Sequence, residues 1–186
     1  MRYSATHKEQ ARKKMLTLTA AKAKQDGFSS TGIDSLAKAA GVTSGAVYSQ
    51  FGSKDGLFAQ MVDSELSRSQ AFFMNKSREE VLEGLKWYLS LSHVTKPGDG
   101  CVMPALSAEI GRAGDEIRQI YERKLTEICE AGSALTGDNA LSWALIAQAI
   151  GAVVISRAMY SDNARLDLLN SVLEVSERIL NESAAK

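Results

Sequence analysis

Proline is scarce in this chain, with two among 186 residues. Because proline breaks helices, its scarcity permits long uninterrupted ones. Cysteine is equally rare: Cys101 and Cys129 are too few for a disulfide scaffold, so we expect a reduced, cytoplasmic protein. Whether the two cysteines could form a disulfide depends on a separation that the sequence does not give.

Long apolar runs are also absent. None approaches the ~18 residues that cross a bilayer, so no membrane segment is expected. The first residues, MRYSATHKEQARKK, lack the apolar segment that follows the basic region of a signal peptide. We therefore expect a protein without membrane contact.

The residue groupings of common enzymes are missing too. There is no Ser/His/Asp grouping, and Gly-Asp-Gly at 98–100 lacks the Gly-Lys-Ser/Thr ending of a phosphate loop. His7 and His93 are isolated, with no second ligand at metal spacing. The sequence predicts neither an enzyme, nor a metal site, nor a cofactor.

The net charge of zero hides an asymmetry along the chain. Residues 1–60 carry 9 Lys/Arg and 4 Asp/Glu, a net of +5, whereas residues 61–186 carry 13 and 18, a net of −5. A basic first third indicates contact with a polyanion such as nucleic acid. The alternative is chance clustering of charges on a solvated helix.

The sequence contains helical patterns and no convincing strand, so we predict an all-α fold. Thr43, Ser53 and Ser77 are suitable N-caps, while Gly27 and Gly41 are suitable helix ends. The nine predicted helices cover roughly 6–26, 31–41, 44–51, 53–74, 78–92, 101–112, 115–132, 139–160 and 164–182. We expect a three-helix head at 1–52 and a helical body at 53–186, connected by the fourth helix at 53–75.

The head contains the pattern of a helix-turn-helix. Leu36, Ala37 and Ala40 form the inner face of its first helix, and Gly41 provides the sharp turn. Val47 anchors the second helix against the first. The second helix then exposes small or hydrogen-bonding residues, namely Thr43, Ser44, Gly45, Ala46, Tyr48, Ser49 and Gln50.

That exposed face suits the major groove of DNA. Small residues at the N-terminus let the backbone approach base edges, and the hydroxyls and the amide can bond to bases or phosphates. Tyr48 can reach the sugar-phosphate backbone. Lys54, beside the start of the next helix, is placed to bind a phosphate.

The stretch GFSSTGIDSLAKAAGVTSGAVYSQFGSKDGLF closely resembles the DNA-binding signature of the tetracycline-repressor (TetR) family of bacterial transcriptional regulators. The resemblance covers about residues 9–60 and includes the Gly-Val-x-x-Gly-x-x-Tyr-x-x-Phe-x-x-Lys spacing. It implies a phosphate contact at Thr31. Gln50 stands where the family often has His, which is expected to alter operator preference.

The resemblance also implies a homodimer that binds double-stranded DNA at a palindromic operator. Its last two helices, at 139–160 and 164–182, would form a four-helix bundle with those of the partner. The first of these is apolar on nearly every side, and Ala144, Ala147, Gly151 and Ala152 would permit close helix approach. The alternative is the core of a monomeric bundle.

The body is expected to enclose a pocket for an unidentified small-molecule effector. The candidate lining residues are aromatic or apolar: Phe72, Trp87, Tyr88, Leu91, Met103, Leu106, Tyr121, Trp143 and Met159. Each has plain core packing as its alternative role. No charged cluster points inward by pattern, which favours an apolar or weakly polar ligand.

Cys101 follows a loop at the expected start of a helix. Because helix N-termini lower thiol pKa values, we predict a reactive thiolate there that responds to electrophiles or oxidants. Gly-Cys at this position also resembles a TetR subgroup that includes electrophile- and oxidant-responsive repressors. The alternative for Cys101 is a small buried hydrophobe; Cys129, in mid-helix, is expected in the core.

Together these patterns predict a DNA-binding transcriptional regulator. We expect a repressor that an effector, or oxidation of Cys101, releases from its operator. The alternative is a helical ligand-binding protein or enzyme without DNA-binding activity.

Overall fold

The computed structural model describes residues 5–74 and 76–182, and all regular structure in these residues is helical. The N-terminal head contains α1 (Ala5–Asp26), α2 (Ile33–Ala39) and α3 (Ser44–Phe51). The body follows, with α4 (Lys54–Phe73), α5 (Arg78–Tyr88), α6 (Leu91–Thr95), the 3-10 helix η1 (Pro97–Asp99), α7 (Met103–Ile110), α8 (Asp115–Thr136), α9 (Asn139–Ala158) and α10 (Asp162–Glu182). The predicted all-α fold is confirmed.

The helix starts are capped where the sequence predicts. The Thr43 hydroxyl accepts the Ala46 N–H at 3.2 Å, and the Ser53 hydroxyl accepts that of Gly56 at 2.9 Å. Ser77 forms a capping box, in which its side chain and that of Glu80 bind each other's backbone N–H groups. These caps satisfy donors that have no partner inside their helices.

The fifth predicted helix, 78–92, is wrong as a single element. It ends at Tyr88, because Leu89 leaves the helical conformation and Ser90 starts α6 by accepting the His93 N–H at 3.3 Å. The described residues therefore contain ten α-helices rather than nine. The break allows Leu89, His93 and Val94 all to be buried.

The head is built around the predicted helix-turn-helix. Leu36, Ala37, Val47 and Phe51 are buried where α1, α2 and α3 meet. Gly41 has a φ of 71°, a conformation that favours glycine, and it turns the chain between α2 and α3. The short helix α3 is thus held in place by neighbours on its inner side.

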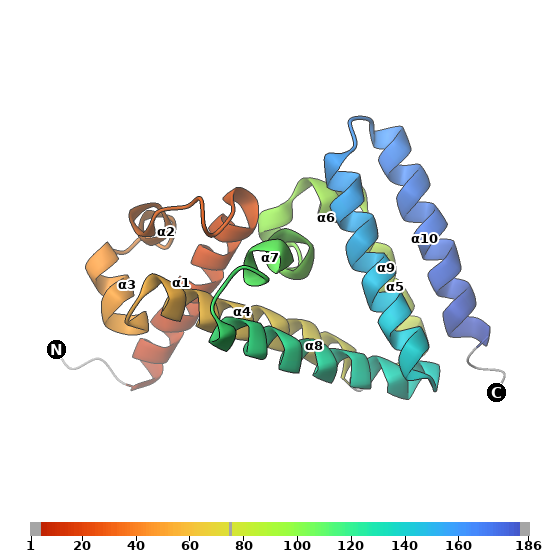
Figure 1. Ribbon diagram of the computed structural model, residues 1–186, viewed down its shortest axis with the longest axis horizontal. Coiled ribbons are helices and arrows are strands. Elements are labelled where there is room, and N and C mark those ends of the chain that lie inside the picture. Colours follow the sequence, from red (N-terminus) through yellow and green to blue (C-terminus); the bar gives the residue numbers. More distant parts are fainter. Residues whose placement is uncertain (1–4, 75, 183–186) are drawn as a thin grey trace.

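The body extends away from the head (Figure 1). Helices α4 and α8 pack along each other, and α9 and α10 form an antiparallel pair at the end of the molecule opposite α3 (Figure 1). One core cluster joins the head to α4, α7 and α8, and a second joins α5, α6, α9 and α10. The shared core makes α4, α7 and α8 the physical link between head and body.

By length and composition alone, α9 is apolar enough to cross a membrane, although its apolar stretch is interrupted by polar residues. Because no single apolar run is long, this property was not predicted from the sequence. In the fold, α9 packs against α6, α7, α8 and α10. These contacts bury only part of the apolar surface of α9, because 28% of its apolar window is buried in the fold.

Candidate nucleic-acid interface and ligand cavity

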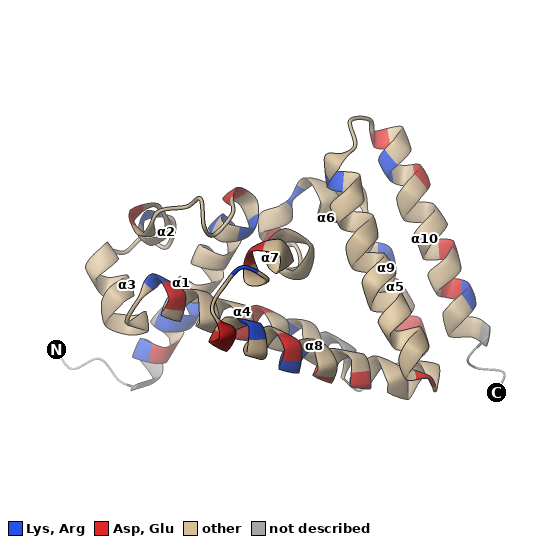
Figure 2. Ribbon diagram, viewed as in Figure 1, with Lys and Arg blue, Asp and Glu red and all other residues tan. Residues whose placement is uncertain are grey.

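Helix α3 has one buried side and one exposed side. Val47 and Phe51 point into the head core, whereas Tyr48 is 47% exposed. The seven residues that the sequence predicts on the outer face are all exposed or half-buried: Thr43, Ser44, Gly45, Ala46, Tyr48, Ser49 and Gln50. Helix α3 carries no Lys, Arg, Asp or Glu (Figure 2), so its outer face is polar and neutral.

Two residues at the start of α3 bond within the head. Ser44 donates a hydrogen bond to Asp34 of α2, and Thr43 caps α3. These bonds fix the direction in which the N-terminus of α3 points. The partial positive charge of that helix end favours phosphate.

Thr31 does not face outward as a phosphate contact requires. It is 5% exposed, and its hydroxyl donates to the backbone carbonyl of Gly27. The predicted phosphate contact at Thr31 is wrong for the side chain in this structure, because the turn after α1 draws it inward. Thr31 instead stabilises the turn that leads into α2.

Lys54 lies at the first position of α4, as predicted. Its Nζ donates to the Ser29 carbonyl at 3.3 Å and lies 5.0 Å from the centre of the Phe28 ring. These contacts hold the ammonium group over the turn before α2, while the side chain stays half-buried. A positive charge is therefore fixed close to the helix-turn-helix.

A cavity of about 540 Å³ lies within the body and reaches the head. Its apolar walls come mainly from α1, α5, α8, α9 and α10, through residues including Leu18, Val81, Leu85, Ile128, Leu145 and Ile150. Such a volume suits a drug-sized organic molecule. Because Thr17, Leu18, Ala21 and Lys24 of α1 form part of the wall, the cavity adjoins the first helix of the head.

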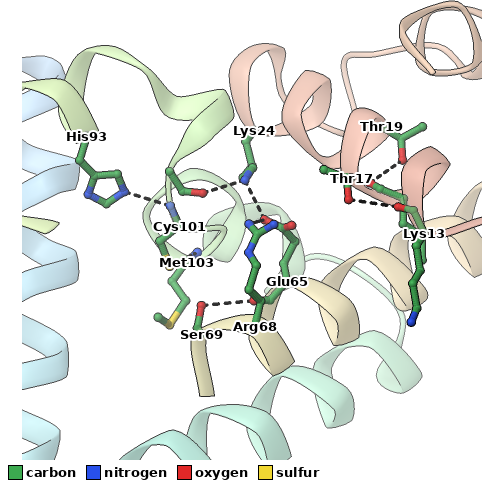
Figure 3. Close-up of polar contacts among 12 residues, drawn as sticks. Lys13, Thr17, Thr19, Lys24, Glu65, Arg68, Ser69, His93, Cys101 and Met103 are labelled. Carbon is green, nitrogen blue, oxygen red and sulfur yellow. Dashed lines mark hydrogen bonds and ion pairs between the residues drawn. The ribbon is translucent and has the colours of Figure 1, made fainter. Parts of the chain in front are cut away.

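A cluster of charged side chains, of which Lys24 and Glu65 are buried, lines this cavity (Figure 3). Lys24 Nζ lies 2.7 Å from Oε2 of Glu65, and Arg68 lies 2.9 Å from the same oxygen. Lys24 also donates to the Gly100 carbonyl at 2.7 Å. The expectation that no charged cluster points inward is wrong, because Lys24 and Glu65 occupy positions among apolar neighbours on α1 and α4.

Cys101 lies beside this cluster, and its backbone is held by a histidine (Figure 3). The Cys101 N–H donates to Nε2 of His93 at 2.9 Å, and the Met103 N–H donates to the Cys101 sulfur at 3.4 Å. Burial nevertheless raises the pKa of the Cys101 thiol, against smaller lowering effects from Met103, Tyr88, Ser69 and Lys24. The predicted low-pKa thiolate is therefore wrong for the resting protein: desolvation outweighs the helix terminus.

The other predicted cavity residues are divided. Trp87, Tyr88 and Met103 line the cavity. Among the described residues Leu91, Leu106, Tyr121, Trp143 and Met159 do not: Tyr121 bonds to Ser107 at 2.7 Å, and Trp143 is 37% exposed on α9. The side chains of His7 and Phe72 lie outside the described residues. Cys129 is buried, as predicted, with its thiol donating to Asn139 Oδ1 at 3.3 Å.

Comparison with known proteins gives a family match for the head. Residues 16–61 match the family model of the bacterial regulatory proteins of the tetR family. Over these residues the head is similar to that family. No curated protein sequence matches the chain.

Solved structures extend the likeness to the whole TetR-type fold. The reduced form of Escherichia coli NemR is similar with a TM-score of 0.77 and 18% identity, over 92% of this chain and 97% of that one. A TetR transcriptional regulator from Legionella pneumophila has a TM-score of 0.74 and 17% identity, over 97% and 100%. The regulator FadR from Bacillus subtilis, in complex with stearoyl-CoA, has a TM-score of 0.64 and 16% identity, over 89% of this chain and 96% of that one.

A second link between body and head in this TetR-type fold was missed by the sequence reading. The carboxylate of Glu109, near the end of α7, accepts the N–H groups of Phe28 at 3.1 Å and Ser29 at 2.6 Å. Burial alone would raise the Glu109 pKa, but the hydrogen bonds from Ser29 and Phe28 outweigh it and the pKa is lowered. Helix α7 thus starts two residues after Cys101, and Glu109 near its end binds the turn before α2.

The outer side of α9 carries an exposed apolar stripe. Its residues recur at helical spacing and include Trp143, Ala144, Ala147, Val154 and Ile155, with half-buried Gly151 among them. On α10, Leu166 and Val175 are also more than one third exposed. Exposed apolar area of this kind marks an interaction surface.

Proposed function

We propose that the chain is a cytoplasmic transcriptional regulator, acting as a homodimeric repressor at a palindromic operator. Residues 1–52 would form the DNA-binding domain and residues 53–186 the effector-binding and dimerisation domain. The protein would act by binding and not by catalysis. The observation that carries this proposal is the uncharged, hydrogen-bonding outer face of α3, supported from behind by Val47 and Phe51.

The face of α3 supports groove reading in four ways. Gly45 and Ala46 allow close approach of the backbone to base edges. Tyr48, Ser49 and Gln50 offer exposed hydroxyl and amide groups for bases and phosphates. Lys54, held by Ser29, supplies a cation at the edge of the same surface. Thr43 and Ser44 would contribute through the helix N-terminus that they orient.

The stripe on α9 and α10 supports a dimer through these two helices. Small residues on α9, such as Ala147 and Gly151, permit close approach of a second copy, and Val154 and Ile155 would be buried by it. A two-fold dimer presents two copies of α3, which must lie about one DNA turn apart, ~34–36 Å, to bind a palindrome.

The cavity supports control by a small molecule. FadR, a protein of similar fold, was solved with stearoyl-CoA, and the cavity here has mostly apolar walls in which a ligand of low polarity would fit. Trp87, Tyr88 and Met103 would contact that effector. We extend the proposal to Cys101, whose modification by an oxidant or electrophile would act at the same place.

Two contacts offer routes from cavity to DNA. Lys24 of α1 bonds to the Gly100 carbonyl next to Cys101, and Glu109 of α7 bonds to the turn before α2. A ligand or modification that moved residues 100–103 would disturb both contacts and change the placement of the two heads. To shift operator occupancy from 99% to 1%, the effector must favour the non-binding state by about 5.5 kcal/mol.

Selection of duplexes by the purified protein from a random pool tests the proposal. A regulator enriches a palindromic sequence, with affinity that falls steeply as salt rises. A ligand-binding protein or enzyme without DNA-binding activity enriches none. Enrichment of no sequence in reducing buffer at modest ionic strength would remove the proposed function.

A further inference from the structure

Tyr88 carries a buried hydroxyl whose hydrogen bonding is weak at rest. Among the described residues its oxygen has no nitrogen or oxygen partner, and the group beside it is the Cys101 thiol. Buried hydroxyls without a strong partner are rare because an unmade hydrogen bond is costly. The position of Tyr88 therefore suits a stronger acceptor than a neutral thiol.

The neighbour of this hydroxyl is the Cys101 thiol. The two side chains line the same cavity, and they lie close enough that each acts on the other's pKa. They are also joined through the backbone, since His93 bonds to the Tyr88 carbonyl through Nδ1 at 2.7 Å and to the Cys101 N–H through Nε2 at 2.9 Å. The Tyr88 and His93 rings meet edge to face at 4.5 Å. This arrangement fixes the tyrosine relative to the cysteine.

The surroundings favour an electron-rich group on the Cys101 sulfur. The Met103 N–H already donates to it at 3.4 Å. Lys24 lies one residue away on the Gly100 carbonyl, and Arg157, bonded to the carbonyls of His93 and Val94, acts electrostatically on Cys101 and Tyr88. A neutral thiol is a weak acceptor, so the Tyr88 hydroxyl gains little from it at rest.

We propose that the Tyr88 hydroxyl is the hydrogen-bond donor for an oxygen placed on the Cys101 sulfur, and that the modification favoured at this site is oxidation to sulfenic acid by a hydroperoxide. The inference rests on the proposed role of Cys101 as a modifiable group. A carbon bonded to the sulfur offers the hydroxyl no acceptor at that position, whereas a sulfur-bound oxygen does. Tyr88 is then a positioning residue that selects the kind of modification.

The step balances with hydrogen peroxide as the oxidant. The sulfur attacks one peroxide oxygen, the S–O bond forms and the O–O bond breaks. The thiol proton passes to the departing oxygen, which leaves as water. The sulfur loses two electrons and the peroxide gains them. The product Cys–S–OH offers an oxygen that accepts from Tyr88.

The test compares wild type with Tyr88→Phe, which removes only the hydroxyl, and with Tyr160→Phe, whose tyrosine is fully exposed. After one equivalent of hydrogen peroxide, sulfenic acid on the Cys101 peptide is trapped with dimedone and quantified by mass spectrometry. The pH midpoint of Cys101 alkylation by iodoacetamide is measured in parallel, with thermal midpoints as a folding check.

We expect Tyr88→Phe to lower the trapped sulfenic acid at least fivefold and to raise the alkylation midpoint by about one pH unit, the equivalent of one hydrogen bond to a charged group. Tyr160→Phe should change neither. Retention of either wild-type value in Tyr88→Phe overturns the proposal.

If Tyr88→Phe does not fold, the order in which the two cysteines of the wild-type protein are oxidised tests the proposal. Cys101 must then form sulfenic acid before Cys129, and oxidation of Cys129 first, or of neither, overturns the proposal. None of these readouts uses DNA, so this inference and operator binding can fail independently.

Discussion

The backbone N–H of Cys101 donates to Nε2 of His93 at 2.9 Å, while Nδ1 of the same ring bonds to the Tyr88 carbonyl at 2.7 Å. Because Nε2 accepts, Nδ1 must carry the proton, so the buried ring is neutral. Gly100 fits against this ring: a Cβ at that position would lie 2.4 Å from its Cδ2 atom. The loop before α7 is thus built around a neutral His93.

This relationship makes stability depend on pH. Burial lowers the pKa of His93, and Arg157 and Lys24 lower it further, against a raising effect from the Tyr88 carbonyl. The unfolded chain therefore takes up the proton first, and the free energy of unfolding should fall as pH drops below the unfolded value of about 6.5. Above about pH 7.5 the contribution of His93 should be constant.

Urea titrations between pH 5 and 8 test this prediction. His93→Gln should flatten the dependence of the free energy of unfolding on pH. His7→Gln, at the other histidine, should leave that dependence unchanged. If the free energy of unfolding fell equally with pH in wild type and His93→Gln, the His93 ring would not cause the pH dependence.

Glu109 should transmit the signal from α7 to the head. We expect Glu109→Gln to change operator affinity less than about threefold, yet to reduce the loss of affinity on oxidation, which for typical couplings is ~5–150-fold. The amide cannot offer two charged acceptors to Phe28 and Ser29. Fluorescence anisotropy with labelled operator, before and after oxidation, measures both quantities; an unchanged response would exclude this route.

Cys101→Ser should retain operator binding and lose the response to oxidants and electrophiles. Wild type should lose at least about tenfold in affinity on treatment. Cys129→Ser is the matched control, because Cys129 is buried and bonded to Asn139. Release of DNA by treated Cys101→Ser would contradict the proposed role of this thiol.

Ile155→Lys should disrupt the dimer. Ile155 is 52% exposed on the α9 stripe, and a buried unpaired ammonium would oppose association. Sedimentation should report a monomer, and affinity for the full palindrome should fall at least ~100-fold because two linked contacts become one. Glu83→Gln, on α5, raises the net charge by the same single unit and should remain dimeric. A dimeric Ile155→Lys protein would place the interface elsewhere.

Local signals account for what the sequence predicts well. Thr43, Ser53 and Ser77 cap helices through bonds to residues three positions away, so the pattern is visible in a short stretch. The split between α5 and α6 was missed because Leu89 continues the apolar spacing although its backbone leaves the helix.

Contacts across long sequence separations account for what the sequence does not predict. Lys24 meets Glu65 across 41 residues, and Ser29 meets Glu109 across 80. A hint was present, because Lys24 and Glu65 follow Ala20 and Met61 at a spacing of four on buried helix faces. The Cys101 pKa could not be predicted, since burial depends on which helices cover the thiol.

The central claim is that α3 reads the operator, and Tyr48→Ala tests it most directly. Tyr48 is exposed on α3 and absent from the core, so the variant should fold and dimerise normally. Anisotropy titrations with the selected palindrome should show an affinity loss of about 10- to 100-fold, as expected for one lost hydrogen bond to a charged phosphate. Tyr160→Ala should bind as wild type. Equal operator affinity for Tyr48→Ala and wild type would contradict the placement of α3 in the groove.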